Sequence, residues 1–453
     1  MRARHEPQRH RVTEKIAGRA AREDGPIRRA PRRGATRPKR SAEMSVINDN
    51  QPFISADRFG RRDGRLRRPS RRIDQLRVSV SLWPALVALG LVLTAASSFA
   101  QQPAARIVSP EVAADRRVTF RLAAPQAREI LLSGEFMPGS KPFEKDAKGL
   151  WTLTIGPLEP EIYHYNVTID GVRTIDPNNP DVKTGSTPST ISSILEVRGS
   201  QPAFYDAQTA EHGEVRSLRY KSTSLGIERR LTVYTPPEYD RDPRARYPVL
   251  YLLHGANADE TAWHRLGRVN LILDNLRPSG RAKPFIVVMP FGYGVPPNTQ
   301  AQPGDNTAKF GRDLIEDVIP LIESRFRTVG DRDHRALVGL SMGGGEALTI
   351  GLNHLELFSH VGGFSAAVGP AAAFPKTYAS LVADGKVSNQ KLRLLWVGCG
   401  KEDGLFDASR SFSEFLTQHH IRHTFHESSG AHTWMVWRRY LNEITPLLFQ
   451  SGQ

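Results

Sequence analysis

The chain has 453 residues and a formal net charge of +15, from 62 Lys+Arg against 47 Asp+Glu. Residues 1–100 hold 23 of the basic and 9 of the acidic residues, so residues 101–453 are nearly neutral, with 39 against 38. This distribution excludes a basic nucleic-acid-binding domain within residues 101–453. The single cysteine, Cys399, excludes an internal disulfide framework and a cysteine-based zinc site.

Residues 1–76 are rich in Arg and Pro and have no apolar periodicity. This composition predicts a basic disordered leader, or sequence upstream of the true start, for which Met44 is a candidate.

Residues 77–100 have the pattern of a signal peptide. An apolar run over 78–96 follows several arginines, and Ser98 and Ala100 supply the small residues that precede a cut before Gln101. The alternative is an uncleaved membrane anchor, but the run is short for a span and contains Pro84. We therefore expect only transient membrane contact, cleavage near Ala100, and a periplasmic or secreted protein.

Residues 101–200 are predicted to form a small all-β sandwich. Short alternating segments are separated by turn residues, and Asp170-Gly171 suits a tight hairpin turn. Three aromatic residues in these segments, Trp151, Tyr163 and Tyr165, fit either a sugar-binding platform or the sandwich core.

Residues 213–450 change to strands that alternate with amphipathic helices, one of them over 314–326. This order predicts a doubly wound, mostly parallel sheet with helices on both faces. Functional residues are then expected at the carboxyl ends of the strands. Candidate core strands are residues 247–253, 285–289, 335–339, 361–365 and 392–398.

A Gly-x-Ser-x-Gly motif follows the third of these strands, as Gly339-Leu340-Ser341-Met342-Gly343. A strand before it and a helix after it are the context in which this motif presents a serine nucleophile on a sharp turn. Glycines on either side let the chain make that turn without a side-chain collision. We therefore predict Ser341 as the nucleophile.

A serine nucleophile needs a base and a carboxylate, which this fold supplies in the order Ser, acid, His. His432 lies in a turn before the last predicted helix, and Asp403 follows the strand 392–398. We predict His432 as the base and Asp403 as the acid, with Glu402 and Asp407 as alternatives for the acid.

Backbone N–H groups should stabilise the oxyanion that forms during attack. One donor is predicted to be the amide of Met342, at the start of the helix. The second should come from the loop after strand 247–253, where the sequence leaves Ala256 and Asn257 as equal candidates.

The other chemistry-bearing residues carry weaker patterns. Trp434 and Trp437 fit either the core or the border of a substrate pocket, whose loops we expect at 291–306 and 366–386. A histidine cluster is predicted to serve surface or packing roles rather than to bind metal: His419, His420, His423 and His426.

These motifs resemble the esterase D/feruloyl esterase type of α/β-hydrolase, of carbohydrate esterase family one, in the form with an N-terminal immunoglobulin-like early-set domain. The resemblance covers about residues 107–448. In the large domain it is carried, in order, by residues 250–259, 267–276, 284–290, 313–326, 339–344, 396–403 and 430–437.

The resemblance implies that Ser341, Asp403 and His432 form the family's triad and hydrolyse carboxylic esters with no cofactor. Family substrates include feruloyl and acetyl esters on plant cell-wall polysaccharide, while related two-domain proteins cleave enterochelin-type siderophore esters. A carbohydrate-binding protein with a degenerate hydrolase domain is the alternative of another class. Oligomeric state is not indicated by any of these patterns.

Overall fold

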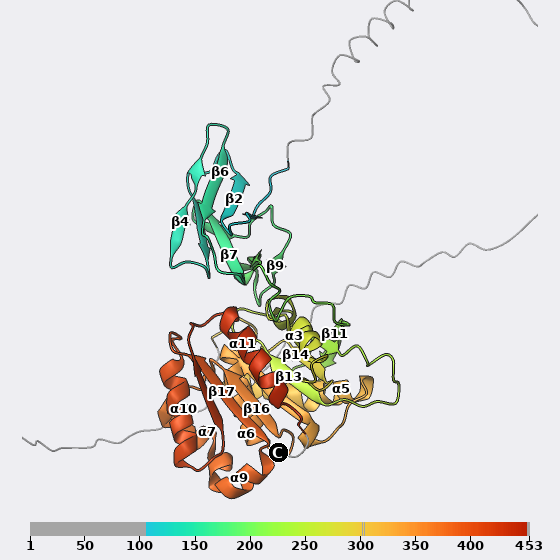
Figure 1. The fold of residues 1–453 in the computed structure, drawn as a ribbon. Helices are drawn as coiled ribbons and strands as arrows, with labels where there is room; N and C mark the ends of the chain where they lie inside the picture. The colour runs from blue at the N-terminus through green and yellow to red at the C-terminus, as the bar shows by residue number, and fades with distance from the viewer. Residues whose placement is uncertain (1–105, 301, 303, 451–453) are drawn as a thin grey trace, which may run out of the picture. The chain divides into compact units, whose positions relative to one another are not determined.

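The structure, a computed structural model, describes residues 106–300, 302 and 304–450. The predicted leader (1–76) and signal peptide (77–100) lie outside the described residues. Two small antiparallel sheets come first in the described part, and a larger, eight-stranded sheet follows (Figure 1). None of the helices in these residues is both long and apolar enough to span a membrane.

The first two sheets pack face to face, and we call them the front sandwich. One has the strand order β1-β2-β6-β5, and the other has the order β4-β3-β7-β10-β9, with β8 paired to β7. The strands are β1 (Glu111–Val112), β2 (Val118–Ala123), β3 (Ile130–Gly134), β4 (Ser140–Pro142), β5 (Glu144–Lys145), β6 (Leu150–Ile155), β7 (Glu161–Ile169), β8 (Val172–Thr174), β9 (Val182–Lys183) and β10 (Ser192–Val197).

The core of the front sandwich contains the aromatic residues for which the sequence left two readings. Trp151, Tyr163 and Tyr165 are at most 5% exposed. Tyr165 packs edge-on against Phe120 from the opposite sheet, with the ring centroids 5.0 Å apart. A sugar-binding platform needs exposed rings, so these residues serve the core and the platform reading is wrong.

The turn from β7 to β8 confirms the predicted hairpin. Asp170 has a φ of 46° and Gly171 a φ of 85°. Positive φ at both central residues is the geometry of a two-residue turn that matches the twist of the flanking strands.

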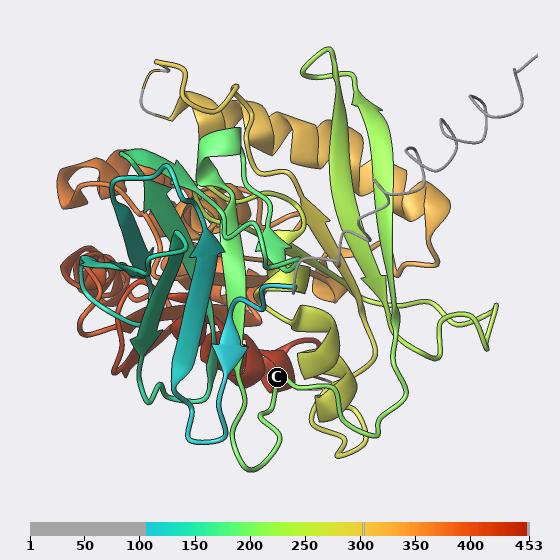
Figure 2. The same cartoon turned by 90° about the horizontal axis from the view of Figure 1, so that it is seen from above.

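The large sheet has the order β11-β12-β14-β13-β15-β16-β17-β18. Strands from β14 to β18 run parallel, which confirms the predicted mostly parallel sheet, while β11 and β12 form a long antiparallel pair at one edge (Figure 2). The strands are β11 (Glu214–Ser222), β12 (Ile227–Thr235), β13 (Val249–Leu253), β14 (Ile286–Pro290), β15 (Arg335–Leu340), β16 (His360–Phe364), β17 (Leu394–Gly400) and β18 (Thr424–Ser428).

Helices cover both faces of this sheet (Figure 1). One apolar cluster packs α5, α6, α7, α8 and α10 against it, and a second cluster packs α2, α3 and α11 against the other face. The helices are α2 (Ala262–Arg265), α3 (Val269–Leu276), α4 (Asp305–Arg312), α5 (Ile319–Arg325), α6 (Ser341–Asn353), α7 (Phe374–Thr377), α8 (Ala379–Ala383), α9 (Gly385–Lys391), α10 (Phe406–Gln418) and α11 (Trp434–Ile444).

The helix predicted over 314–326 differs from the expectation, because Asp313–Val318 is π-helical and only Ile319–Arg325 is α-helical. Pro320 has no N–H to donate to a carbonyl in the preceding turn, so the regular hydrogen-bond ladder is interrupted there.

Arg438 joins the front sandwich to the last helix. Its fully buried guanidinium forms an ion pair with Glu161 and donates to the carbonyl oxygens of Ile162 (3.0 Å) and Leu266 (2.7 Å). The guanidinium also lies 5.0 Å from the ring centroid of Tyr205. One charged group in α11 therefore satisfies buried acceptors of β7 and of the loop before α3.

We expect Arg438→Met to lower the free energy of unfolding by about 3–5 kcal/mol, because it leaves the carboxylate of Glu161 without its buried partner. Urea unfolding measures the change. The adjacent exposed residue supplies the control, since Arg439→Met should stay within about 0.5 kcal/mol of wild type. A loss below 1 kcal/mol in Arg438→Met would contradict the role given to this contact.

Candidate active site

Ser341 stands on a strained turn between β15 and α6. Its φ is 53°, a conformation that side chains other than glycine seldom adopt. A Cβ on Gly339 would lie 2.2 Å from the carbonyl oxygen of Gly343, and one on Gly343 would lie 2.4 Å from that of His254. Both motif glycines are therefore required by close backbone approach, and the turn presents the Ser341 hydroxyl beyond the end of the strand.

The structure brings together the three residues predicted as a triad. The Ser341 Oγ lies 3.0 Å from His432 Nε2, and His432 Nδ1 lies 2.9 Å and 3.1 Å from the two carboxylate oxygens of Asp403. These residues follow β15, β17 and β18, whose carboxyl ends share one edge of the parallel sheet. The arrangement can pass a proton from the hydroxyl to an imidazole that a carboxylate orients.

Asp403 is held in its ionised form by its neighbours. Burial of its carboxylate would raise its pKa, but hydrogen bonds from His432, the Leu405 amide and the Ser365 hydroxyl outweigh burial and lower that pKa. The Leu405 amide donates over 2.8 Å. Ser365 was not predicted, although it directly follows β16 at the same sheet edge, and Trp437 Nε1 donates to its hydroxyl over 3.1 Å.

The two alternative acids have other partners. The Glu402 carboxylate accepts a hydrogen bond from the amide of Gly430. Asp407 lies in the first turn of α10 and pairs with Arg410 at 2.8 Å. Asp403 is thus the one of the three candidates whose carboxylate contacts His432.

The predicted oxyanion donors lie on both sides of Ser341. The amide of Met342 is in the first turn of α6, where backbone N–H groups have no acceptor within the helix. The Asn257 amide already donates to the Tyr293 hydroxyl over 2.9 Å. The Ala256 amide, in contrast, has no acceptor among the described residues. Of the two candidates left open by the sequence, Ala256 has the free donor.

His254 fixes the direction of that donor. Its Nδ1 lies 2.8 Å from the Gly255 carbonyl oxygen, and its Nε2 accepts from the Gly292 amide over 2.9 Å, so Nδ1 carries the proton. In a trans peptide the C=O and the following N–H point in opposite directions. Because the imidazole holds the Gly255 carbonyl on one side of this peptide, the Ala256 N–H faces the other side, away from His254.

A cavity of about 460 Å³ lies beside Ser341 and His432. Trp434 and Trp437 border it, but both are buried, with 3% and 6% of their surface exposed, in the apolar cluster that packs α11 against the sheet, so they serve the core as well. None of the described residues in the loops predicted to form the pocket, 291–306 and 366–386, lines this cavity, so this expectation was wrong. The loop after β13 lines it through residues 255–258, and Leu340 lies beside Ser341. The front sandwich supplies the rest of the wall, through Glu135, His164, Arg173, Lys183, Thr190 and Ser192.

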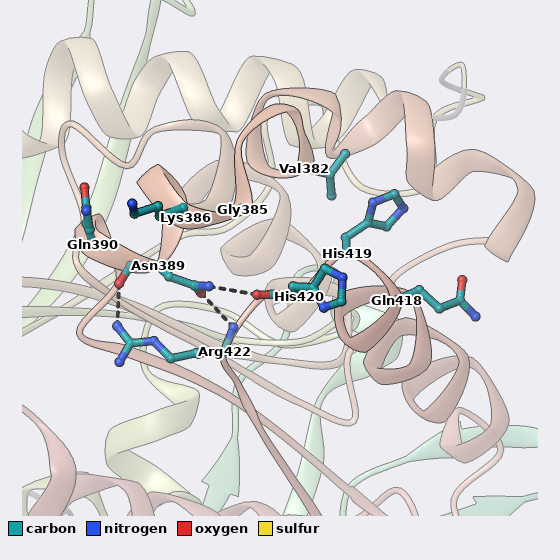
Figure 3. Close-up of a pocket in the computed structure, with 9 residues that line it drawn as sticks. All are labelled: Val382, Gly385, Lys386, Asn389, Gln390, Gln418, His419, His420 and Arg422. Carbon is teal, nitrogen blue, oxygen red and sulfur yellow. Dashed lines mark hydrogen bonds between the residues drawn. The ribbon is translucent and has the colours of Figure 1, made fainter.

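A second cavity, of about 690 Å³, lies among residues of α9 and the end of α10 (Figure 3). Its polar groups bond one another. The Asn389 side chain donates through Nδ2 to the His420 carbonyl oxygen over 2.8 Å, and its Oδ1 accepts from the backbone amide of Arg422 over 2.7 Å. His419 and His420 line it, but in the described part of the chain no group of three metal-ligating side chains is assembled. This cavity contains none of the triad residues.

Residues 222–448 match the model of the Esterase family, described as "Putative esterase". A curated relative from Xylanibacter ruminicola, named Endo-1,4-beta-xylanase/feruloyl esterase, is 32% identical over 349 residues, covering 75% of this chain and 46% of that protein. An acetyl esterase from Caldicellulosiruptor saccharolyticus is 25% identical over 222 residues, covering 43% of this chain and 80% of its own. The chain thus spans about half the length of the first of these relatives.

Solved structures are also similar. An enterobactin esterase from Shigella flexneri has a TM-score of 0.55 at 18% identity, covering 74% of this chain and 93% of its own. A ferulic acid esterase from Anaeromyces mucronatus, in complex with ferulic acid, has a TM-score of 0.47 at 25% identity, covering 56% and 98%. The first likeness shows the fold, so the α/β-hydrolase prediction is confirmed for the large sheet and its helices.

Two buried histidines make stability depend on pH. Burial lowers the pKa of His254 and of His360 to about 4, from an ordinary value of 6.5. The unfolded chain therefore binds these protons near pH 6.5 and the folded chain only near pH 4, so the stability present above pH 6.5 is lost as pH falls through this window.

We expect each of these histidines to lower the free energy of unfolding by about 2 kcal/mol between pH 7 and pH 5. Urea unfolding at the two pH values measures the loss, and His360→Gln should reduce it by about half. An equal loss in wild type and in this variant would show that His360 is not the titrating group.

Proposed function

Because this chain belongs to the esterase family, we propose that it is a serine esterase that hydrolyses carboxylic esters through an acyl-enzyme. The observation that carries the proposal is the continuous contact from Ser341 through His432 to Asp403, beside two backbone amides that have no acceptor in the described part of the chain. In this reading Ser341 is the nucleophile, His432 the general base and acid, and Asp403 the residue that orients the imidazole.

The reaction proceeds in two halves. His432 Nε2 takes the proton of Ser341 as Oγ attacks the ester carbonyl carbon, and the amides of Met342 and Ala256 donate to the resulting oxyanion. His432 then protonates the leaving alcohol. In the second half His432 takes a proton from water, which attacks the acyl-enzyme and releases the acid. No cofactor is required for these steps.

We propose feruloyl or acetyl esters on plant cell-wall polysaccharide as the substrates. The relative named Endo-1,4-beta-xylanase/feruloyl esterase supports this class, since it shares 32% identity over 75% of this chain. Cleavage near Ala100 and a periplasmic or secreted location belong to the same proposal, as does an immunoglobulin-like early-set identity for the front sandwich.

Initial rates on methyl ferulate, acetylated xylan and a ferric catecholate ester test the proposal. We expect the full chain to turn over the first or second substrate, and Ser341→Ala to lower kcat by about 10⁴-fold or more. Preference for the catecholate ester would favour the siderophore-esterase alternative. Retention on polysaccharide without serine-dependent turnover would favour a binding protein with a degenerate hydrolase domain.

Ser365 provides a separate test, as a positioning residue that acts through Asp403. We expect Ser365→Gly, which tolerates the φ of 45° and lacks the hydroxyl, to lower kcat about tenfold with little change in KM, because the hydroxyl that helps to keep Asp403 ionised is lost. The acid limb of the kcat–pH profile should also move to higher pH, since the hydroxyl lowers the pKa of Asp403.

The control for this variant is Ser388→Gly, which removes a buried serine whose hydroxyl bonds only the Leu381 carbonyl oxygen. Ser388→Gly should leave the kcat–pH profile at its wild-type position. A change in KM alone, or an unmoved acid limb in Ser365→Gly, would contradict the positioning role.

A further inference from the structure

The wall that the front sandwich gives to the cavity beside Ser341 is rich in charge. Of its residues, Lys183 and Arg173 are cationic and Glu135 is anionic, while His164 is the fourth titratable group. Lys183 comes from β9, and Arg173 comes from β8. A cavity that combines a candidate nucleophile with cations from another part of the chain raises the question of what those cations bind.

Lys183 is buried, with 7% of its surface exposed. Its ammonium donates to the carbonyl oxygens of Asn257 (2.8 Å) and Thr190 (3.2 Å). An ammonium has three donors, so one N–H of Lys183 has no acceptor among the described residues. Burial lowers the pKa of Lys183, and the nearby carboxylates of Asp259 and Glu135 oppose that effect. An anion bound at the free N–H would stabilise the charged form further.

Arg173 carries a positive charge without a carboxylate partner. Its guanidinium donates to the Ser189 carbonyl oxygen, to the side-chain oxygen of Asn166 and, over 3.4 Å, to the Ser192 hydroxyl. No carboxylate of the described residues is within ion-pair distance of it. Because a guanidinium stays protonated and binds carboxylates in a two-pronged geometry, these neutral contacts orient it without neutralising it.

Two carboxylates, Glu135 and Asp259, lie near these cations, and only Glu135 lines the cavity. Glu135 is occupied by His164: its carboxylate accepts from the His164 amide over 3.0 Å and lies 3.4 Å from His164 Nε2. Burial lowers the pKa of His164, which favours the neutral imidazole. Asp259 accepts from the amide and the hydroxyl of Thr261, over 2.9 Å and 2.7 Å. The sandwich wall thus presents two cations against one carboxylate.

We infer that Lys183 and Arg173 form an anion subsite that binds a carboxylate carried by the substrate next to its scissile ester. The inference rests on the proposed esterase function and adds a substrate class to it: acidic esters over neutral ones. Lys183 also touches the loop that carries Ala256 and Asn257, so a bound carboxylate would lie close to the predicted oxyanion donors. The carboxylate could come from either side of the ester. On the alcohol side it would belong to a uronate of the polysaccharide, and on the acyl side it would be the free carboxylate of a dicarboxylic half-ester.

Two matched pairs of esters distinguish these sources. Carboxymethyl ferulate against propyl ferulate places the charge on the alcohol side, and the 4-nitrophenyl half-ester of adipate against 4-nitrophenyl hexanoate places it on the acyl side. The full chain should show a higher kcat/KM for the charged member of at least one pair. Since exposed charges are screened by salt, the preference should shrink between 20 mM and 500 mM NaCl.

Arg173→Gln is the decisive variant, because its effect is read as the ratio of kcat/KM between the charged and the neutral member. We expect this ratio to fall about tenfold, the size of one hydrogen bond to a charged group, and Arg173→Lys to recover part of it. Lys183→Met should lower the same ratio. Arg128→Gln, which removes an exposed arginine of the front sandwich outside the cavity, should leave the ratio at its wild-type value.

Three outcomes overturn the inference. The first is equal or lower kcat/KM for the charged member of both pairs. The second is a preference for charge that Arg173→Gln and Lys183→Met both leave intact. The third is serine-independent or absent turnover of both members of both pairs, which would overturn the proposed function as well; serine-dependent turnover of the neutral esters without preference for charge would overturn the anion subsite alone.

Discussion

The whole site depends on one sharp reversal of the chain, between β15 and α6. The backbone strain at Ser341, with its positive φ, is tolerated because two glycines let carbonyl oxygens of Gly343 and His254 approach within distances that no Cβ would allow. This close backbone packing places the Ser341 hydroxyl over the sheet edge. It also places the first turn of α6 next to the substrate carbonyl that the hydroxyl would attack. Every other candidate group is useful only because it meets the serine at this point.

Much of this arrangement could be predicted because parallel strands end at one edge. A serine, an acid and a histidine that each follow such a strand must come close together, however far apart they lie in the sequence. The family model confirms the esterase family, and the similar solved structure confirms the α/β-hydrolase fold of the large sheet. The sequence already favoured Asp403 over Glu402 and Asp407 as the acid, and the structure places only the Asp403 carboxylate of these three against His432.

The cavity wall could not be predicted, for a different reason. Lys183 and Arg173 reach the site through packing between the front sandwich and the loop after β13, and no periodicity or motif in the sequence encodes such a contact. Loops near the serine were the natural expectation, and they turned out to hold other roles: Tyr293 bonds the Asn257 amide from outside the cavity. The π-helical turn before Pro320 escaped prediction because an amphipathic pattern does not distinguish it from a regular helix.

The buried guanidinium of Arg438 has an evolutionary consequence. Modules that evolution shuffles between enzymes are joined by linkers and keep self-sufficient surfaces. Here a charge in the last helix completes the hydrogen bonding of a strand in the first part of the chain, with Glu161 and Tyr205 as its partners. A recombination event that replaced either part alone would leave the Arg438 guanidinium or the Glu161 carboxylate without its buried partner. The two parts are therefore expected to have been inherited together and to have diverged as a pair.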